Sequence, residues 1–301
     1  MYEFYEGALK TKENFVEMFR QATLQDLGAE TVVWLLSYFY QYSTFKPDST
    51  VYGILIAYLS KTSHFSQVLY LLQVMKEKDI KMNEVLYTNA MVACLHGNNY
   101  EGALQLFEEA RQCPDIQLNH FLYTNALVAF MRSGQYQKAL DVYEQMKQNS
   151  LQINKVTASN VALAHARMGN WKAALNFLIE CKSGNAFEVD EAFYNIAVHV
   201  CSIGKRSDYA KLLINQMEQK KITPTIITYT GLLQCFINEN NFKASLKLFE
   251  AIEKSTQISL DVKFVNTFLE FCRHREYWKV SYDIFKRVLS RKPSCTPNIK
   301  Q

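Results

Sequence analysis

The apolar positions of this chain follow a helical spacing, and the whole pattern recurs along the sequence. The clearest copy is the stretch from Tyr123 to Met146, YTNALVAFMRSGQYQKALDVYEQM. Equivalent positions, which we call the anchor positions of repeats one to seven, lie alternately 35 and 36 residues apart. They are Tyr52, Tyr87, Tyr123, Ala158, Tyr194, Tyr229 and Val265. A fixed period of this size predicts a repeat array.

Each repeat also contains a small, a large apolar and a third buriable residue, which are Ala139, Tyr143 and Met146 in repeat three. Spacings of four and three place these residues on one helix face. The break before them contains Gly134 in repeat three and Gly169 in repeat four, and glycine suits a helix C-cap. Each repeat is therefore predicted to be a helical hairpin, and the array to be all-α. An aromatic column after the breaks is expected in the hairpin core: Phe65, Tyr100, Tyr136, Trp171, Phe242 and Trp278.

The domain organisation follows from this period. Residues 1–48 match the repeat poorly and are predicted to form an atypical N-terminal helical cap, as terminal units of arrays often do. The array itself is expected over residues 49–297, followed by a tail at 298–301. Its seven repeats are 49–83, 84–119, 120–154, 155–190, 191–225, 226–261 and 262–297. The clearest connector is residues 221–225, where Pro224 separates two hairpins.

Composition excludes several classes of protein. The 301 residues are 49% hydrophobic and include only ten Gly and five Pro, which argues against long linkers. The net charge of +4 is too small to identify a polyanionic partner by itself. The seven Cys form no Cys-x-x-Cys pair and the six His are scattered, so no metal site and no cofactor are expected, and the thiols are expected to be reduced and structural. No apolar run reaches the length that a membrane span needs.

The stretches YTNALVAFMRSGQYQKALDVYEQM and YTGLLQCFINENNFKASLKLFEAI resemble the pentatricopeptide repeat family, and the chain is closest to its plain P-type arrays. The resemblance covers about residues 49–297 and implies an all-α, right-handed superhelical solenoid. It also implies an organellar protein that holds single-stranded RNA along the first helices of its hairpins. The mitochondrial matrix is the expected location and a plastid the alternative, although the acidic first thirty residues do not look like a transit peptide.

The resemblance implies a column of RNA backbone contacts nine residues after each anchor position, where the family typically has lysine. In this chain the column contains Lys61, His96, Arg132, Arg167 and His274. Cations at equivalent places of successive repeats would follow the phosphates of a strand. The column is interrupted by Ile203 and Asn238, and a second interpretation remains, since Lys and Arg near helix C-termini also favour the helix dipole.

The resemblance implies that the residue after each anchor position reads one base together with the last residue of the same repeat. The pairs are Thr88 with Asn119, Thr124 with Asn154, Ser159 with Asp190, Asn195 with Thr225, Thr230 with Asp261, and Asn266 with Asn298. In the family these combinations favour A, A, G, pyrimidine, G and pyrimidine, so the expected preference is A-A-G-Y-G-Y. Gly53 lacks a reading group, and repeat one is expected to be silent. An alternative is that these short polar residues only begin helices, although an N-cap should precede the anchor position.

Base stacking is implied two residues before the anchor position. Val85, Phe121, Val156 and Ile227 are the predicted stacking residues, whereas Ala192 and Lys263 suit the task less well.

Catalysis is not expected, because the chain lacks phosphate-loop, zinc-protease and serine-hydrolase motifs. Two hypotheses remain open. The chain is a sequence-selective RNA-binding protein that acts in RNA processing, stability or translation. Alternatively, it is a structural subunit of a mitochondrial ribosome or RNA-processing complex, or a protein scaffold. The expected partners are single-stranded RNA and proteins of a ribonucleoprotein complex, with no membrane and no small-molecule substrate.

Overall fold

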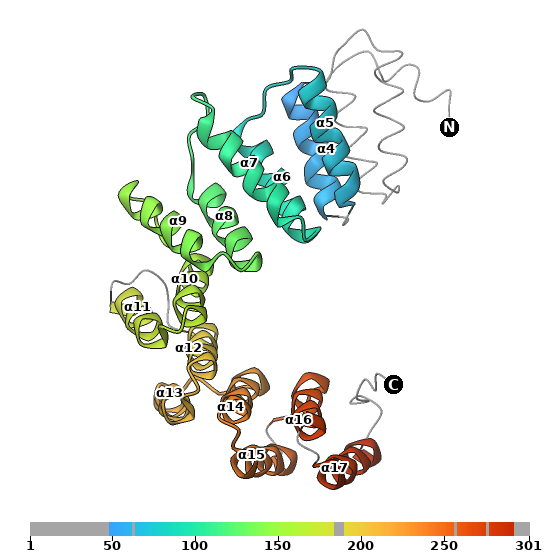
Figure 1. The fold of residues 1–301 in the computed structure, drawn as a ribbon, viewed down its shortest axis with the longest axis vertical. Coiled ribbons are helices and arrows are strands. Elements are labelled where there is room, and N and C mark those ends of the chain that lie inside the picture. Colours follow the sequence, from blue (N-terminus) through green and yellow to red (C-terminus); the bar gives the residue numbers. More distant parts are fainter. Residues whose placement is uncertain (1–47, 62–63, 184–189, 256–257, 275–276, 292–301) are drawn as a thin grey trace. The chain divides into compact units, whose positions relative to one another are not determined.

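The computed structural model describes residues 48–61, 64–183, 190–255, 258–274 and 277–291. These ranges contain fourteen α-helices and no strand (Figure 1). Seven first helices are α4 (Ser49–Lys61), α6 (Glu84–His96), α8 (His120–Arg132), α10 (Lys155–Arg167), α12 (Glu191–Ile203), α14 (Ile226–Asn238) and α16 (Val262–His274). Seven second helices are α5 (Phe65–Glu77), α7 (Tyr100–Gln112), α9 (Tyr136–Gln148), α11 (Trp171–Ser183), α13 (Ser207–Gln219), α15 (Phe242–Lys254) and α17 (Trp278–Arg291). The predicted tail, and the predicted N-terminal cap except Asp48, lie outside the described residues.

The chain divides into two compact units, which meet in sequence between Ile153 and Asn154. In the first unit, α4, α6 and α8 each pack on the second helix that follows, and the three first helices pack on one another in order. In the second unit, α10, α12, α14 and α16 form the same arrangement with their partners. Within each unit, the first helix of every repeat therefore packs on the first helix of a neighbouring repeat, as stacking of helical hairpins requires.

The predicted apolar columns form the core of each unit. Ala103, Ala139, Ala174 and Ala210 are fully buried, so that first and second helices approach closely at these small residues. The large-residue column is buried from Leu72 through Phe249, and the third column is buried in all seven repeats. The predicted helical hairpins are confirmed, and their stability comes from burial of this repeated face.

The hairpin turns require left-handed backbone. Gly134 and Gly169 have φ of +77° and +86°, which confirms their predicted role in ending the first helices. In repeat three the N–H of Gln135 donates to the Phe130 carbonyl at 2.9 Å, and Asn170 donates to His165 in the same way. Asn98, Lys205 and Asn240 adopt positive φ at the equivalent position of their repeats. The turn is thus preserved where the glycine is absent.

The alternation of 35- and 36-residue repeats arises in the connectors that follow the second helices. Asp79, Ser150 and Lys221 have positive φ and end the second helices of repeats one, three and five. In repeats two and six the helix is instead followed by an extended residue, Cys113 with ψ of 116° and Ser255 with ψ of 136°. The longer repeats therefore leave the helix by a different route.

The aromatic column lies at the start of the second helices and packs between hairpins. A Cβ atom at Gly204 would lie 2.6 Å from Cγ of Trp171, which belongs to the preceding repeat. The rings of Phe242 and Tyr277 stack with centroids 3.8 Å apart. The column is half-buried except at Trp278, which is exposed. Trp171 and Phe242 pack against the buried core, as predicted, and they also form contacts between successive repeats.

Candidate nucleic-acid interface

The first members of the predicted base-reading pairs lie in the second turn of the first helices. The hydroxyl groups of Thr88, Ser159 and Thr230 donate to the carbonyl four residues earlier, at 2.8, 2.6 and 2.7 Å respectively. These three residues and Asn266 are half-buried. Thr124 is only 8% exposed, so its hydroxyl is the least accessible of this group. A hydroxyl that donates to its own helix keeps acceptor capacity toward a ligand.

The second members of the pairs are the N-caps of the next first helices. Side-chain oxygens of Asn119, Asn154, Asp190 and Asp261 accept hydrogen bonds from backbone N–H groups in the first turn of the helix that follows. Asn83, outside the predicted readers, caps α6 in the same way. These second members therefore cap helices, four residues before the anchor position, whereas the first members lie inside the helices. Thr124 and Asn154 belong to different units.

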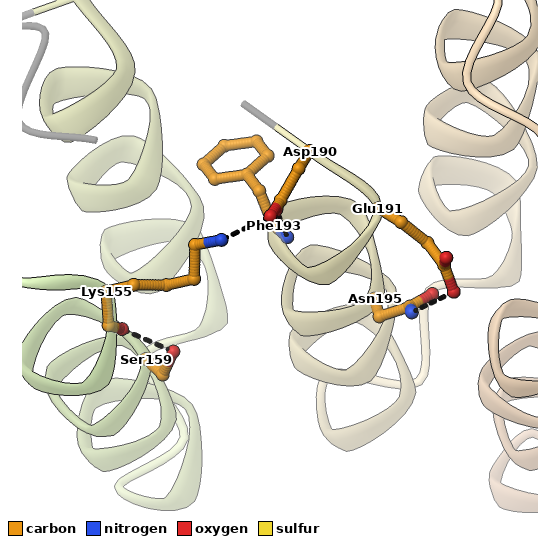
Figure 2. Close-up of polar contacts among 6 residues, drawn as sticks. All are labelled: Lys155, Ser159, Asp190, Glu191, Phe193 and Asn195. Carbon is orange, nitrogen blue, oxygen red and sulfur yellow. Dashed lines mark hydrogen bonds and ion pairs between the residues drawn. The ribbon is translucent and has the colours of Figure 1, made fainter. Parts of the chain in front are cut away.

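In repeat four, Asp190 belongs both to the predicted reading pair and to an ion pair with Lys155 (Figure 2). The ammonium group of Lys155 donates to Oδ2 of Asp190, while Oδ1 of Asp190 accepts the N–H of Phe193 at 3.1 Å. The hydrogen bond from Lys155 holds the pKa of Asp190 below its usual value. Because both side chains are partly exposed, this ion pair contributes little to folding. A base that approaches Asp190 would meet a carboxylate whose charge is already partly compensated.

Repeat five ties both members of its pair into one polar network. The amide of Asn195 donates to Glu191 at 3.2 Å, as Figure 2 shows, and its carbonyl oxygen accepts the Thr228 hydroxyl at 2.7 Å. The hydroxyl of Thr225 donates to the same Glu191 carboxylate at 2.6 Å. This network joins α12 to α14, and it leaves Asn195 fewer unused hydrogen-bonding groups than the readers of the other repeats.

The predicted stacking residues are large apolar side chains that are exposed to solvent. Val85 and Phe121 in the first unit are 62% and 55% exposed, and Val156 and Ile227 in the second unit are 51% and 61% exposed. Each lies in the first turn of its helix, three residues before the predicted base reader. Ala192 and Lys263, at the same place in their repeats, are exposed as well. Because these side chains are mostly exposed, their burial contributes little to the stability of the fold.

The predicted backbone column lies at the ends of the first helices. Lys61, His96, Arg132 and Arg167 are exposed, while the side chain of His274 lies outside the described residues. Arg132 also donates to the Leu95 carbonyl of the preceding first helix at 3.3 Å. At the interruption in repeat six, Asn238 donates to the equivalent Ser202 carbonyl at 2.7 Å. A side chain at this position therefore donates a hydrogen bond to a carbonyl group near the end of the preceding first helix. The spacing of the residues did not predict this role.

Two features are absent from the part of the chain that the structure describes. None of the helices is long and apolar enough to cross a membrane. Within the same ranges, no group of three or more His, Cys, Asp and Glu is arranged to hold a metal ion. The six described cysteines are free, and burial raises the pKa of Cys94 and Cys272 to about 11 and that of Cys201 to about 12. Such thiols are poor nucleophiles at neutral pH.

The stacked hairpins, with polar N-caps and exposed apolar side chains at the start of each first helix, define a helical-repeat binding protein. The family model for the pentacotripeptide-repeat region of PRORP matches residues 131–291, and the chain belongs to the pentatricopeptide repeat family. This result confirms the resemblance inferred from the sequence.

Similar proteins fall into this family too. A chloroplastic pentatricopeptide repeat-containing protein of Arabidopsis thaliana is 23% identical over 233 residues, which is 76% of this chain and 25% of the relative. Small ribosomal subunit protein mL103 of the same plant is 24% identical over 242 residues, 80% of this chain and 58% of the relative. The chain thus spans between a quarter and three-fifths of the length of these two relatives.

Solved structures share the fold. The crystal structure of PPR10 from maize has a TM-score of 0.66 at 20% identity, over 95% of this chain and 40% of that one. PPR10 in complex with an 18-nt psaJ RNA element has a TM-score of 0.76 at 14% identity, over 89% and 39% of the two chains. The predicted fold class, an all-α helical-repeat solenoid, is confirmed.

Proposed function

We propose that this protein binds single-stranded RNA along its first helices, without catalysing a reaction, and acts in RNA processing, stability or translation within an organelle. The observation that carries the proposal is the column of exposed apolar side chains Val85, Phe121, Val156 and Ile227. Each begins a first helix, beside an N-cap that presents an amide, carboxylate or hydroxyl group.

Exposure of these side chains has a physical implication. An apolar side chain that is more than half exposed in the folded protein contributes little to stability, so the fold alone does not account for four of them at one place in the repeat. A flat base would cover such a side chain and bring its own edge to the neighbouring polar groups. Stacking of a base on an aromatic side chain contributes about 1–3 kcal/mol and tolerates any base.

The polar groups then supply selectivity, to different degrees. Repeats two, four and six pair an accessible hydroxyl with an N-cap, and these support the A, G and G of the expected A-A-G-Y-G-Y. The reader of repeat three is nearly buried, and that of repeat five is engaged by Glu191. We therefore expect repeats two, four and six to contribute most of the sequence preference.

Exposed cationic side chains on the first helices also favour RNA binding. Lys61, His96 and Arg132 are exposed at the ends of the first helices of the first unit, and Arg167 is exposed in the second unit. Arg132 uses one donor for the Leu95 carbonyl, and a guanidinium group has further donors available for a phosphate. The proposal draws support from PPR10, whose solved complex contains RNA. A chloroplastic relative and a ribosomal one support an organelle, and we favour the mitochondrial matrix over a plastid.

The test is direct binding of two labelled RNAs at one fixed salt concentration. The first contains AAGUGU and the second contains its reverse complement. Tighter binding of the first is expected if the base-reading residues work as proposed. Equal affinity would refute the base code while retaining RNA binding, and absence of binding to either RNA would refute the function.

A second candidate is a structural subunit of a ribonucleoprotein complex, and a different surface favours it. Ile179 on α11, with Tyr209 and Leu212 on α13, is exposed beside a pocket of about 410 Å³. The pocket is also lined by Tyr194, whose hydroxyl is buried without a hydrogen-bond partner. An apolar pocket between second helices suits an apolar side chain of another protein. Sedimentation of the native protein with ribosomal particles after a high-salt wash would support this candidate.

A further inference from the structure

The interruption of the cationic column leaves two adjacent first helices without a permanent positive charge. The helix α14 contains no charged residue, and the charged or titratable residues of α12 are Glu191, Tyr194, His199 and Cys201. The places where other repeats present Lys, Arg or His are filled by Ile203 and Asn238. On these two helices, His199 is therefore the side chain that can become cationic.

His199 lies on the helix face that the proposal assigns to RNA. It is four residues after the predicted reader Asn195 and four before Ile203, so the three share one line along α12. Part of the side chain is exposed to solvent, and its Nδ1 lies 3.4 Å from the Ser202 hydroxyl. The imidazole thus lies one helical turn before the missing cation.

The charges around His199 are positive. Arg167 on α10 and Lys263 on α16 are both exposed, and both act on the imidazole. Partial burial of the ring, followed by these two charges, lowers the pKa of His199 below its usual value. Among the acidic groups on the neighbouring second helices, Glu180 on α11 acts on the Cys181 thiol. Asp208 on α13 pairs with Arg206 at 2.6 Å and also acts on the Cys201 thiol of α12. The charges that shift the pKa of His199 itself are the two cations. Positive groups gathered without a carboxylate suit an anion.

We propose that protonated His199 contacts a phosphate of the bound RNA, in place of the cation that repeat five lacks. This inference rests on the proposed RNA-binding function and adds a residue and a pH dependence to it.

RNA affinity depends on pH because the pKa of His199 differs between the free protein and the RNA complex. In the free protein the neighbouring cations disfavour protonation of His199. A bound phosphate compensates those charges and favours the imidazolium, so the pKa is higher in the complex. RNA binding therefore takes up a proton. Affinity increases as the pH falls below the pKa of the complex, by up to about tenfold for each pKa unit that separates the two states.

The experiment compares four proteins with the AAGUGU RNA at about pH 6 and pH 8, at several salt concentrations. They are wild type, His199→Gln, His199→Lys, and the control His165→Gln. His165 is half-buried on α10, two residues from Arg167 and off the line of predicted contacts. Urea unfolding of each variant at both pH values separates changes of binding from changes of folding.

Wild type and His165→Gln are expected to bind about three- to tenfold more tightly at the lower pH, with a salt slope steeper by about 0.7. His199→Gln should bind more weakly at the lower pH and show a smaller pH dependence than wild type. His199→Lys should bind tightly at both pH values, which a merely structural histidine would not produce. An unchanged pH dependence in His199→Gln would overturn the role of His199 and leave the RNA-binding proposal intact. Absence of RNA binding by every protein would instead overturn the proposed function.

Discussion

Replacement of Phe121 by alanine separates RNA binding from folding. The ring is 55% exposed and lies against the His120 imidazole with ring centroids 3.8 Å apart. A fully buried phenylalanine costs about 3–5 kcal/mol when truncated, and the exposure of this ring reduces the expected loss of folding free energy to about 1 kcal/mol. Loss of one stacked base costs about 1–3 kcal/mol of binding free energy. The dissociation constant should therefore rise by about 5- to 150-fold while the protein remains folded.

A matched control lies on the other helix type of the same unit. Tyr70 on α5 is 54% exposed, so Tyr70→Ala removes an aromatic ring of similar exposure from a second helix. Fluorescence anisotropy with the AAGUGU RNA, together with urea unfolding, measures both quantities for both variants. The Tyr70 variant should bind like wild type. If Phe121→Ala binds as tightly as wild type, or if both variants lose affinity equally, the assignment of the stacking column is wrong.

Three other predictions concern groups with defined contacts. Asn83→Ala removes the N-cap of α6 and should lower the free energy of unfolding in urea by about 1 kcal/mol. Arg132→Ala and Asn238→Ala each remove a hydrogen bond between repeats and should each cost about 1 kcal/mol of stability, but only the arginine variant should also flatten the salt slope of RNA binding, by about 0.7. Because burial raises the pKa of Cys94 to about 11, iodoacetamide at pH near 8 should alkylate half-buried Cys113 first and Cys94 only in urea, and equal rates in the native protein would contradict this.

Much of the fold follows from spacing along the chain. Ala139, Tyr143 and Met146 share a helix face whatever the neighbouring repeat does, and the structure buries all three. Gly134 likewise predicted a helix end, because left-handed backbone favours glycine. Local geometry fixes these features, so one repeat is enough to predict them and seven copies reinforce the prediction.

The candidate site was less predictable because its contacts run between repeats. The bonds from Lys155 to Asp190 and from Thr225 to Glu191 join residues about one repeat apart, and their formation depends on how closely two hairpins stack. The N-caps could have been found, since short polar residues stand four places before successive anchor positions. The sequence interpretation expected N-caps before the anchor positions but did not identify the second members of the reading pairs as those caps. Whether the readers bind RNA remains a prediction.

The two kinds of connector after the second helices make the natural building block of this chain a pair of hairpins. Left-handed exits occur at Asp79, Ser150 and Lys221 in repeats one, three and five, and extended exits occur at Cys113 and Ser255 in repeats two and six. The exit of repeat four lies outside the described residues. Insertion or deletion of a single hairpin would bring two exits of the same kind together and disturb the alternation. Insertion or deletion of two hairpins would preserve it, so engineered versions with more or fewer binding positions are best made in steps of two.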